Sequence, residues 1–563
     1  MEMKKFWSVL SAGLLLTTLS LIPSAADTAV PSFTFGITDD SSGKTDGGVV
    51  KVSYVMGNGS PKAPDVGLWC LSVTDSTCTP ATVLLIRVLV SPCREKSLPT
   101  DVCIKSLKSA DSSGAMQNAA LLFEADTNKF PKNDTYQTPA GGGISVWRGS
   151  SSLGGTLDYS VSVNIGMMYW RDSKSSAITG YSAQIVPVTI KDEAHEQAFI
   201  NSQDNNWHSP CVFVDPTRCA MAAPFQADQK MELALQMDNR ITGWIFARLK
   251  DTVVSSKVLS KTTSLLTIQG SSINVPSGLS TIPLTAIAQS PGLQEVDATA
   301  QGAWSRMAAD AAAGKETPTI GGSLPSNHPQ LFSFPVLRWA DGTVHYPSKD
   351  VAGTGFFQAI EPWLKTSKLT PTWRFQGMAA SSFWDMSTDL GNKVYACTVQ
   401  DKSKIHGVIS TNAMAYTWNP PELKDGSLNY KVAGAHTDLD GSIYKGNYTL
   451  SMNVDSAKCM YGFKTIPAKA TVSVVSADGT TQDIATEALN VSNNWMNLSA
   501  NNFTFSAPTI KIKLSQSTTS GTASTTKPAA TSAQKGSIIC VKGTSVMKMA
   551  GANSKCPVGY KKK

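Results

Sequence analysis

Residues 159–167 read Tyr-Ser-Val-Ser-Val-Asn-Ile-Gly-Met, and this stretch decides the fold class. Large apolar residues occupy every second position, and Ser, Asn or Gly stands between them. Successive side chains of a strand point to opposite faces, so this pattern buries one face and leaves the other in water. The stretch therefore predicts a strand of an antiparallel sheet that has one face on a core.

The same alternation recurs in Met231–Met237, Tyr448–Val454 and Ile510–Leu514. Helical patterns are few: residues 300–314 are alanine-rich, and residues 356–365 carry apolar side chains on one helical side. We therefore expect a mainly β protein of several antiparallel, sandwich-like domains in series, with a small mixed α/β segment and a disulfide-closed C-terminal module.

Composition shifts along the chain predict the domain boundaries. The low-complexity run that begins at Gln516 contains nothing that can build a core, so it predicts a flexible linker. The expected order is a signal peptide (1–26), a β domain (27–190), a second β domain (191–290), a mixed Trp-rich segment (291–404), a third β domain (405–514), a Ser/Thr/Ala-rich linker (515–536) and a basic C-terminal module (537–563).

Charge is concentrated at one end. The chain has 563 residues and a formal net charge of +7, yet residues 515–563 hold eight lysines and no Asp or Glu. The body is therefore near neutral, which argues against a basic surface for nucleic acid. With 41% hydrophobic and 16% charged residues, the composition is that of a globular protein and excludes both an acidic disordered chain and a multi-span membrane protein.

The N-terminus has the pattern of an export signal. Lys4 and Lys5 precede the apolar stretch Leu10–Ile22, and Ala26 ends a small-residue cleavage site. The apolar stretch is short for a membrane span of about 20 residues, so a retained anchor is the weaker alternative. We expect a secreted or cell-wall-associated protein without a membrane span after signal cleavage.

The ten cysteines of an exported chain predict disulfides. Proximity in sequence couples Cys70 with Cys78, Cys93 with Cys103, Cys211 with Cys219, and Cys540 with Cys556, which leaves Cys397 and Cys459 as the last pair. Asp215-Pro216 predicts a hairpin turn between Cys211 and Cys219. Zinc is the weaker alternative, because no Cys-x-x-Cys and no His at finger spacing occurs. We expect no metal site and no cofactor.

The C-terminal module resembles a short element of exported actinobacterial proteins, on the residues Ser537-Ile-Ile-Cys-Val-Lys-Gly and Lys555-Cys-Pro-Val-Gly-Tyr-Lys-Lys-Lys563. The body resembles an uncharacterised family that carries this tail, on Cys103-Ile-Lys-Ser-Leu, Ile241-Thr-Gly-Trp-Ile-Phe-Ala-Arg-Leu-Lys, Leu428-Asn-Tyr-Lys-Val-Ala-Gly-Ala-His436 and Ala457-Lys-Cys-Met-Tyr-Gly-Phe463. The resemblance implies an extracellular or envelope location and no particular activity.

The lysines of this module suit an anionic cell-wall polymer, because they stand on a disulfide-closed knob at the end of a tether. A solubilising tag without a ligand is the alternative. The lysines concerned are Lys542, Lys548, Lys555, Lys561, Lys562 and Lys563.

Motifs for several reactions are missing. No Gly-x-Ser-x-Gly elbow occurs, and Phe199 stands where the helix of a zinc protease would place a second histidine after His195. Asp438-Leu-Asp440-Gly resembles a calcium loop, but Ile443 stands where an EF-hand has glycine. A turn between two strands is the better interpretation of that segment.

Residue types that could form a site converge only between 328 and 385. Tryptophans and carboxylates are the groups that glycoside hydrolases use, and exposed tryptophans alone serve carbohydrate binding. The remaining alternative is that these tryptophans fill a core. The candidate ligand-binding residues are Trp339, Trp363, Trp373, Trp384, Asp341 and Asp385.

Two functions follow. The first is an exported, non-catalytic surface or binding protein of the cell envelope, whose partner is an anionic cell-wall polymer or a polysaccharide. The alternative is an extracellular carbohydrate-active hydrolase that uses the carboxylates of Asp341, Glu361 and Asp385.

Overall fold

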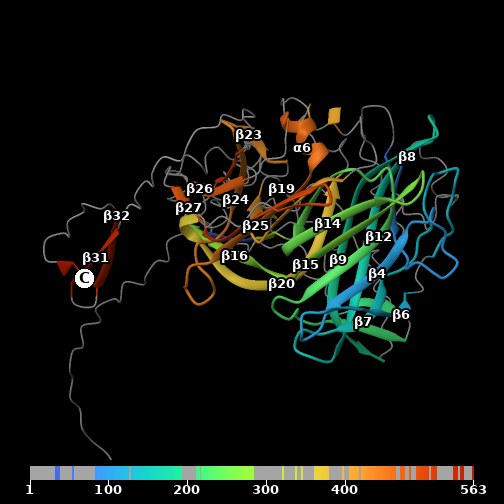
Figure 1. Ribbon diagram of the computed structural model, residues 1–563. Helices are drawn as coiled ribbons and strands as arrows, with labels where there is room; N and C mark the ends of the chain where they lie inside the picture. The colour runs from blue at the N-terminus through green and yellow to red at the C-terminus, as the bar shows by residue number, and fades with distance from the viewer. Residues whose placement is uncertain are drawn as a thin grey trace, which may run out of the picture. The chain divides into compact units, whose positions relative to one another are not determined.

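The computed structural model forms two compact units, Met1–Gln516 and Ser517–Lys563. Strands make up most of the residues that the structure describes, which confirms the mainly β fold (Figure 1). The structure describes residues 32–37, 53–55, 83–125, 129–192, 211–215, 217–283, 320–322, 337–338, 344–345, 361–378, 393, 396–397, 405–416, 420–464, 469–475, 481–483, 490–505, 509–515, 537–542, 545–550 and 561–562.

A central sheet runs through the first unit. Its described neighbouring strands are antiparallel except for two parallel pairs, β13 with β21 and β1 with β17. In spatial order its strands are β28 (Asn490–Ser492), β29 (Trp495–Thr504), β25 (Lys445–Asn453), β21 (Ile405–Thr411), β13 (Gly243–Arg248), β20 (Leu364–Met378), β9 (Ser175–Lys191) and β8 (Thr156–Trp170).

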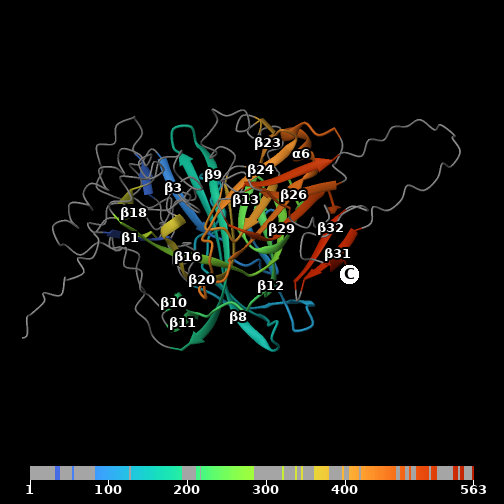
Figure 2. The same cartoon turned by 90° about the vertical axis from the view of Figure 1, so that its left-hand side faces the viewer.

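Shorter strands extend this sheet. The side of β8 that faces away from β9 pairs first with β7 (Ser145–Ser150) and then with β3 (Val83–Leu89). The long strands β8 and β9 are seen from another side in Figure 2. The other additions are β2 (Ser53–Val55), β6 (Ala120–Glu124), β10 (Cys211–Asp215), β11 (Arg218–Ala222), β16 (Ile273–Pro283), β1 (Ser32–Ile37) and β17 (Ile320–Gly322). A separate pair is β18 (Leu337–Arg338) with β19 (Val344–His345).

A second sheet packs against one face of the central sheet. Leu233 and Ile268 of this sheet share a core with Val161 and Ile165 of β8. The indole nitrogen of Trp373 in β20 donates to the carbonyl oxygen of Gly270 at 2.9 Å and so connects the two layers. The strands of the second sheet are, in order, β14 (Lys250–Val258), β15 (Thr263–Ser271), β12 (Lys230–Asp238), β4 (Cys103–Ala110) and β5 (Met116–Asn118).

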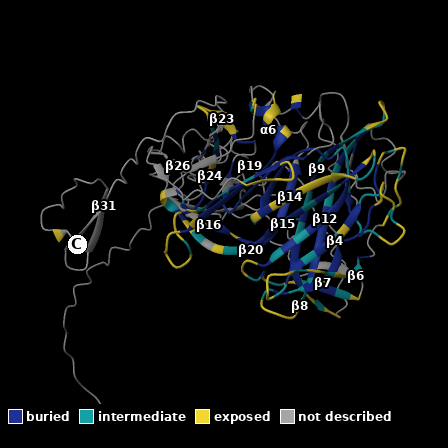
Figure 3. Cartoon of the chain, viewed as in Figure 1, coloured by how far each residue is buried: buried dark blue, intermediate teal, exposed yellow. Residues whose placement is uncertain are grey.

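A third sheet shares a core with the other face of the central sheet. Tyr430 and Ile512 of this sheet are fully buried in the same core as Leu450 of β25. Its strands are β22 (Ala415–Tyr416), β23 (Glu422–Lys424), β24 (Ser427–Ala433), β30 (Thr509–Ser515), β26 (Lys469–Val475) and β27 (Thr481–Asp483). The central sheet therefore lies between two cores, and buried residues follow its strands (Figure 3).

The strand β13 shows how the two cores meet. Its sequence is apolar at nearly every position, and all six residues are buried. Ile245 and Ala247 face the first core, whereas Trp244 and Phe246 face the second. A strand buried on both faces cannot alternate in polarity, which is why the period-two pattern does not mark it.

Two predicted elements end at other residues in the structure than the sequence pattern predicts. The predicted strand Tyr448–Val454 ends at Asn453, because the Asn453 side chain accepts hydrogen bonds from the backbone of Asp455 and Ser456 and begins helix α6 (Val454–Tyr461). The predicted helix over residues 356–365 is wrong at its C-terminal end: residues Glu361–Trp363 form a 3₁₀ turn, η3, and Leu364 begins β20. The Thr-rich sequence after Leu364 favours a strand.

Strand pairs cross the boundaries predicted between body domains. The β9–β20 ladder connects residues 180–185 with residues 373–378, and the β13–β21 ladder connects residues 243–247 with residues 405–410. The segments predicted as separate domains in the body therefore share hydrogen-bonded sheets within one compact unit.

Several cysteine predictions are confirmed. Cys93 pairs with Cys103, and Cys397 pairs with Cys459 on helix α6. The strands β10 and β11 form the predicted hairpin, and Cys219 in β11 is disulfide-bonded. The predicted partners of the remaining pairs lie outside the described residues or on side chains that the structure does not describe: Cys70, Cys78, Cys211, Cys540 and Cys556.

The C-terminal unit contains a small antiparallel sheet. Its order is β32 (Ser545–Ala550), β31 (Ser537–Lys542) and β33 (Lys561–Lys562). Lys542, Lys548, Lys561 and Lys562 lie on these strands, and the side chain of Lys561 is exposed. Lys555 and Lys563 lie outside the described residues. An envelope-binding role for these lysines stays a prediction.

Candidate functional site

A disulfide-closed loop between β3 and β4 forms one wall of a cleft. Two turns shape it: the backbone nitrogen of Ser97 donates to the carbonyl oxygen of Arg94 at 2.9 Å, and that of Asp101 donates to Leu98 at 3.0 Å. Pro99 stands at the second position of the Leu98–Asp101 turn, where its fixed φ is favourable. The disulfide Cys93–Cys103 holds the two ends with their Cα atoms 4.9 Å apart. The sequence of the loop thus dictates a compact, closed shape.

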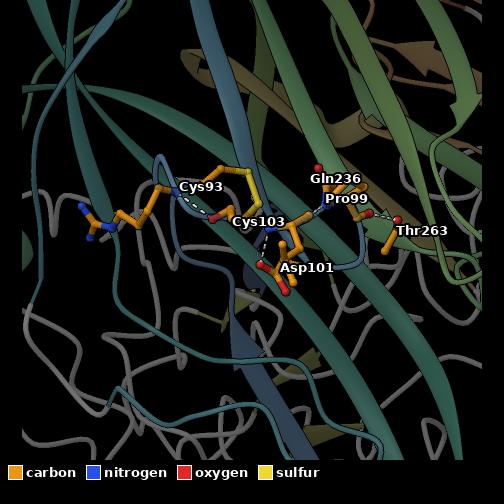
Figure 4. Close-up of a disulfide and its surroundings, with 9 residues drawn as sticks. Cys93, Pro99, Asp101, Cys103, Gln236 and Thr263 are labelled. Carbon is orange, nitrogen blue, oxygen red and sulfur yellow. Dashed lines mark hydrogen bonds between the residues drawn. A yellow bond between two sulfur atoms is a disulfide. The ribbon is translucent and has the colours of Figure 1, made fainter.

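Side chains of the second sheet hold this loop in place. The amide nitrogen of Gln236 in β12 donates to the carbonyl oxygen of Leu98 at 2.7 Å. The hydroxyl of Thr263 in β15 donates to the carbonyl oxygen of Pro99 (Figure 4). The Asp101 carboxylate accepts from the backbone nitrogen of Leu98 at 2.7 Å, which fixes the turn itself. The loop is therefore anchored on both strands that it crosses.

The cleft beside the loop has a volume of about 1190 Å³. Six segments far apart in sequence line it: the disulfide loop, the end of β6 at Glu124, the segment around Lys132, the beginning of β9, the turn after β12 and the turn before β15. The lining is charged or polar on several sides and includes Asp101, Lys132, Asp134, Asp238 and Asn239.

Arg240 braces two of these walls. Its guanidinium contacts both carboxylate oxygens of Asp238, within its own turn, and donates to the hydroxyl of Ser176 at the beginning of β9. A further N–H donates to the backbone carbonyl of Gln137 at 2.9 Å. The Arg240 side chain is 32% exposed and that of Asp238 is 19% exposed, so this charge-assisted network is mostly out of water.

Lys132 stands among carboxylates from three walls of the cleft. It contacts the Asp134 carboxylate at 2.8 Å. This hydrogen bond, the charge of Asp134 and the more distant charges of Asp101 and Asp238 raise the pKa of Lys132 above its usual value. The ammonium group therefore stays protonated over the physiological range, and the carboxylates near it are partly neutralised.

Apolar groups also line the cleft. Pro92, Val102, Pro139, Ala177 and Ile178 line the cleft together with the small side chain of Ala140, which is exposed. The hydroxyl of Thr138, another lining residue, is buried and makes no hydrogen bond to any described residue. The lining of the cleft is therefore amphipathic, with apolar groups beside groups that form hydrogen bonds.

The Trp-rich segment is only partly described. Trp339, Asp341, Trp384 and Asp385 lie outside the described residues. Trp363 lies in the turn η3 and is half-buried, and the side chain of Glu361 beside it is not described. Trp373 is fully buried between the central and second sheets, so its assignment to a ligand-binding surface is corrected: it fills the core, as one alternative held.

The segment with two Asp residues before β25 forms a turn. The Asp440 carboxylate accepts from the backbone nitrogen of Ser442 at 2.9 Å, and that of Asp438 accepts from the nitrogen of Leu439. Hydrogen bonds from the side chain and the backbone of Ser442 hold the pKa of Asp440 below its usual value. Among the described residues, no group of three or more His, Cys, Asp or Glu side chains is arranged to hold a metal ion.

The residues that line the cleft were not predicted as a site. Arg94, Glu124 and Arg240 are ordinary charged residues in turns or at strand ends, and only the fold brings them together. One sequence signal did point here: Cys93 and Cys103 enclose a charged and turn-rich segment, which is typical of an exposed, closed loop.

No family model, curated protein or solved structure matches the chain. Among the helices that the structure describes, none is long and apolar enough to cross a membrane. The geometry of the cleft is therefore the basis for a functional proposal.

Proposed function

We propose that the protein is an exported, non-catalytic binding protein of the cell envelope, and that its cleft holds a hydroxyl-rich ligand such as a segment of a cell-wall or extracellular polysaccharide. The observation that carries this proposal is the cleft of about 1190 Å³ beside the Cys93–Cys103 loop. This volume lies just above the usual range of ligand pockets, about 300–1,000 Å³, which suits more than one sugar ring.

The chemistry of the walls supports a saccharide. A sugar ring has an apolar face and a rim of hydroxyl groups that both donate and accept hydrogen bonds. The more accessible apolar lining residues, Val102, Ala140 and Ala177, can take the apolar face. Carboxylates such as Asp101 accept hydrogen bonds, and the ammonium group of Lys132 donates them. Both kinds of partner that a hydroxyl requires are thus present.

Rigid walls also support binding. Arg240, Gln236 and Thr263 hold three segments in place before any ligand arrives. A ligand then loses less free energy to ordering the site, which raises its affinity. If fewer hydrogen bonds held these segments, the ligand would have to order them, and its affinity would be lower.

Export is supported by the disulfides, because such bonds persist in oxidising compartments. The lysine-rich C-terminal unit would keep the protein near an anionic polymer of the wall, as its resemblance to exported actinobacterial proteins implies. The alternative of a hydrolase rests on Asp341, Glu361 and Asp385, and no observation on the described side chains favours it.

Binding of the mature chain to isolated cell walls and to a panel of insoluble polysaccharides, at low and at high salt, tests this proposal. Ala140→Trp fills the cleft from an exposed position and should abolish retention on the polysaccharide that the wild type binds. The control is Leu153→Trp, because Leu153 is 82% exposed on a turn outside the cleft.

Retention through the cleft should persist in high salt, since its charged groups are largely paired within the protein. Retention through the tail should be lost in high salt and in a full-length variant with Lys561, Lys562 and Lys563 changed to Gln. Equal retention of Ala140→Trp and wild type on every polysaccharide would rule the cleft out as the binding site.

A further inference from the structure

A buried carboxylate lies at the inner wall of the cleft. Glu124 ends strand β6, and its side chain is only 2% exposed although it lines the cleft. An ionised carboxylate in such a place requires a cationic partner, because its lost hydration is otherwise uncompensated. The surroundings of Glu124 therefore show what kind of group this position accepts.

The backbone around Glu124 leaves room for a carboxylate. A Cβ atom on Gly142 would stand 2.2 Å from the Glu124 Oε1 atom and 1.9 Å from the Ser91 hydroxyl, so a larger residue there would displace both side chains. The backbone nitrogen of Gly143 donates to the same Oε1 at 3.4 Å, which is a long and weak hydrogen bond. The protein thus shapes a space for the carboxylate but supplies little neutralising charge from its backbone.

The cationic partner comes from the surface. Arg94, the residue after Cys93 in the disulfide loop, contacts the Glu124 carboxylate through one guanidinium nitrogen, while its side chain is 59% exposed. Arg240 is different: it is 32% exposed and contacts groups on three segments. Arg94 is therefore a single-contact partner that a competing cation can replace at small cost, whereas the carboxylate behind it is fixed.

We propose that Glu124 is a cation subsite of the cleft, which Arg94 occupies in the unliganded protein and which the ammonium group of an amino sugar occupies in the complex. This inference rests on the proposed function and names its substrate class: a hydroxyl-rich ligand with free primary amines. The exchange conserves charge at Glu124, because one cation replaces another and the Arg94 side chain turns to solvent. The ligand's ammonium gains a buried, charge-assisted hydrogen bond.

Soluble glucosamine oligomers and their N-acetylated counterparts, titrated into the mature chain by calorimetry, test the subsite. The wild type should bind the amine form about tenfold more tightly, because its ammonium gains a buried charge-assisted hydrogen bond while the released Arg94, already 59% exposed, regains contact with water. Glu124→Gln keeps the shape and should make the two affinities equal. Arg94→Ala removes the competing cation and should tighten binding of the amine form alone.

Arg148→Ala is the matched control, because Arg148 is 53% exposed, pairs with the 15% exposed Asp158 and does not line the cleft. It should leave the preference for the amine form unchanged. Equal binding of both oligomers by the wild type, or tighter binding of the acetylated one, overturns the subsite and leaves the proposed function standing.

Chemical rescue tests the cation subsite independently of saccharide binding. Arg94→Ala should melt at a lower temperature than the wild type, and millimolar methylguanidinium should restore part of the loss, but not in Arg94→Ala combined with Glu124→Gln. If neither oligomer binds, amino-sugar binding fails, and rescue still decides whether Glu124 accepts an external cation. Absence of rescue in Arg94→Ala overturns the cation subsite.

Discussion

Arg240 is the residue whose removal tests how rigid the cleft is. Arg240→Ala leaves the Asp238 carboxylate, which is 19% exposed, without its bidentate partner. We expect the free energy of unfolding to fall by about 1–3 kcal/mol and the affinity for the polysaccharide to fall with it. Chemical denaturation and binding of the same variant check this. Arg148→Ala, which removes an exposed pair, should cost less and leave binding intact.

Asp111 shows a pH effect that is separate from the cleft. Hydrogen bonds from the side chains of Ser113 and Gln117 lower its pKa from 3.8 to about 2. A carboxyl group with a lowered pKa in the folded state stabilises the protein above its unfolded pKa, and this contribution disappears as the pH falls through the folded value. The difference in melting temperature between the wild type and Asp111→Ala should therefore be constant above pH 3.8. It should become smaller as the pH falls towards about 2. A difference that grows on acidification would contradict this assignment.

The residue scale also shows what the sequence could not predict. The side chain of Glu124 is buried where Gly142 and Gly143 approach it and Arg94 contacts it, and these contacts depend on a folded loop. In the sequence Glu124 is one carboxylate among many at the end of an apolar run. The sequence pattern indicated the tryptophans between 328 and 385 instead. One of these candidates, Trp373, is fully buried in the core.

At the scale of elements, removal of the Cys397–Cys459 disulfide should cost more stability, whereas removal of the Cys93–Cys103 disulfide should cost more binding affinity. The Cys93–Cys103 bond closes a loop of 10 residues and the Cys397–Cys459 bond one of 62 residues. Chain entropy then predicts losses of about 2.5 and about 4 kcal/mol when each pair is changed to Ser. Only the Cys93/Cys103 variant should lose affinity for the cleft ligand, because its loop forms a wall. Equal loss of affinity in both variants would mean that the loop is not specifically involved.

The strands themselves were largely predictable, and their partners were not. Alternation in Tyr159–Met167 and Met231–Met237 predicts β8 and β12, because one face of each strand must be apolar. Pairing carries no such local signal: β9 lies beside β20, which follows it by more than a hundred residues. β13 escapes the pattern for a physical reason, since both of its faces contact a core.

At the scale of the whole molecule, β13 explains why the segments of the body share one compact unit. It contributes side chains to both cores and pairs with β20 on one side and β21 on the other. These strands belong to three of the segments that composition separates. Each segment alone would expose an unpaired strand edge and an apolar face, so independent folding of any one of them is costly.

We therefore expect residues 83–505 to unfold as one cooperative body. Phe503→Ala, which removes a fully buried ring from the second core, should cost about 3–5 kcal/mol. If the cores are coupled, amide hydrogen exchange should accelerate by the same factor in β29, which contains Phe503, and in β8, which belongs to the first core. Leu153→Ala, at an exposed turn next to β8, should change neither. Acceleration confined to β29 and its neighbours would show that the segments unfold as separate domains despite the shared ladder.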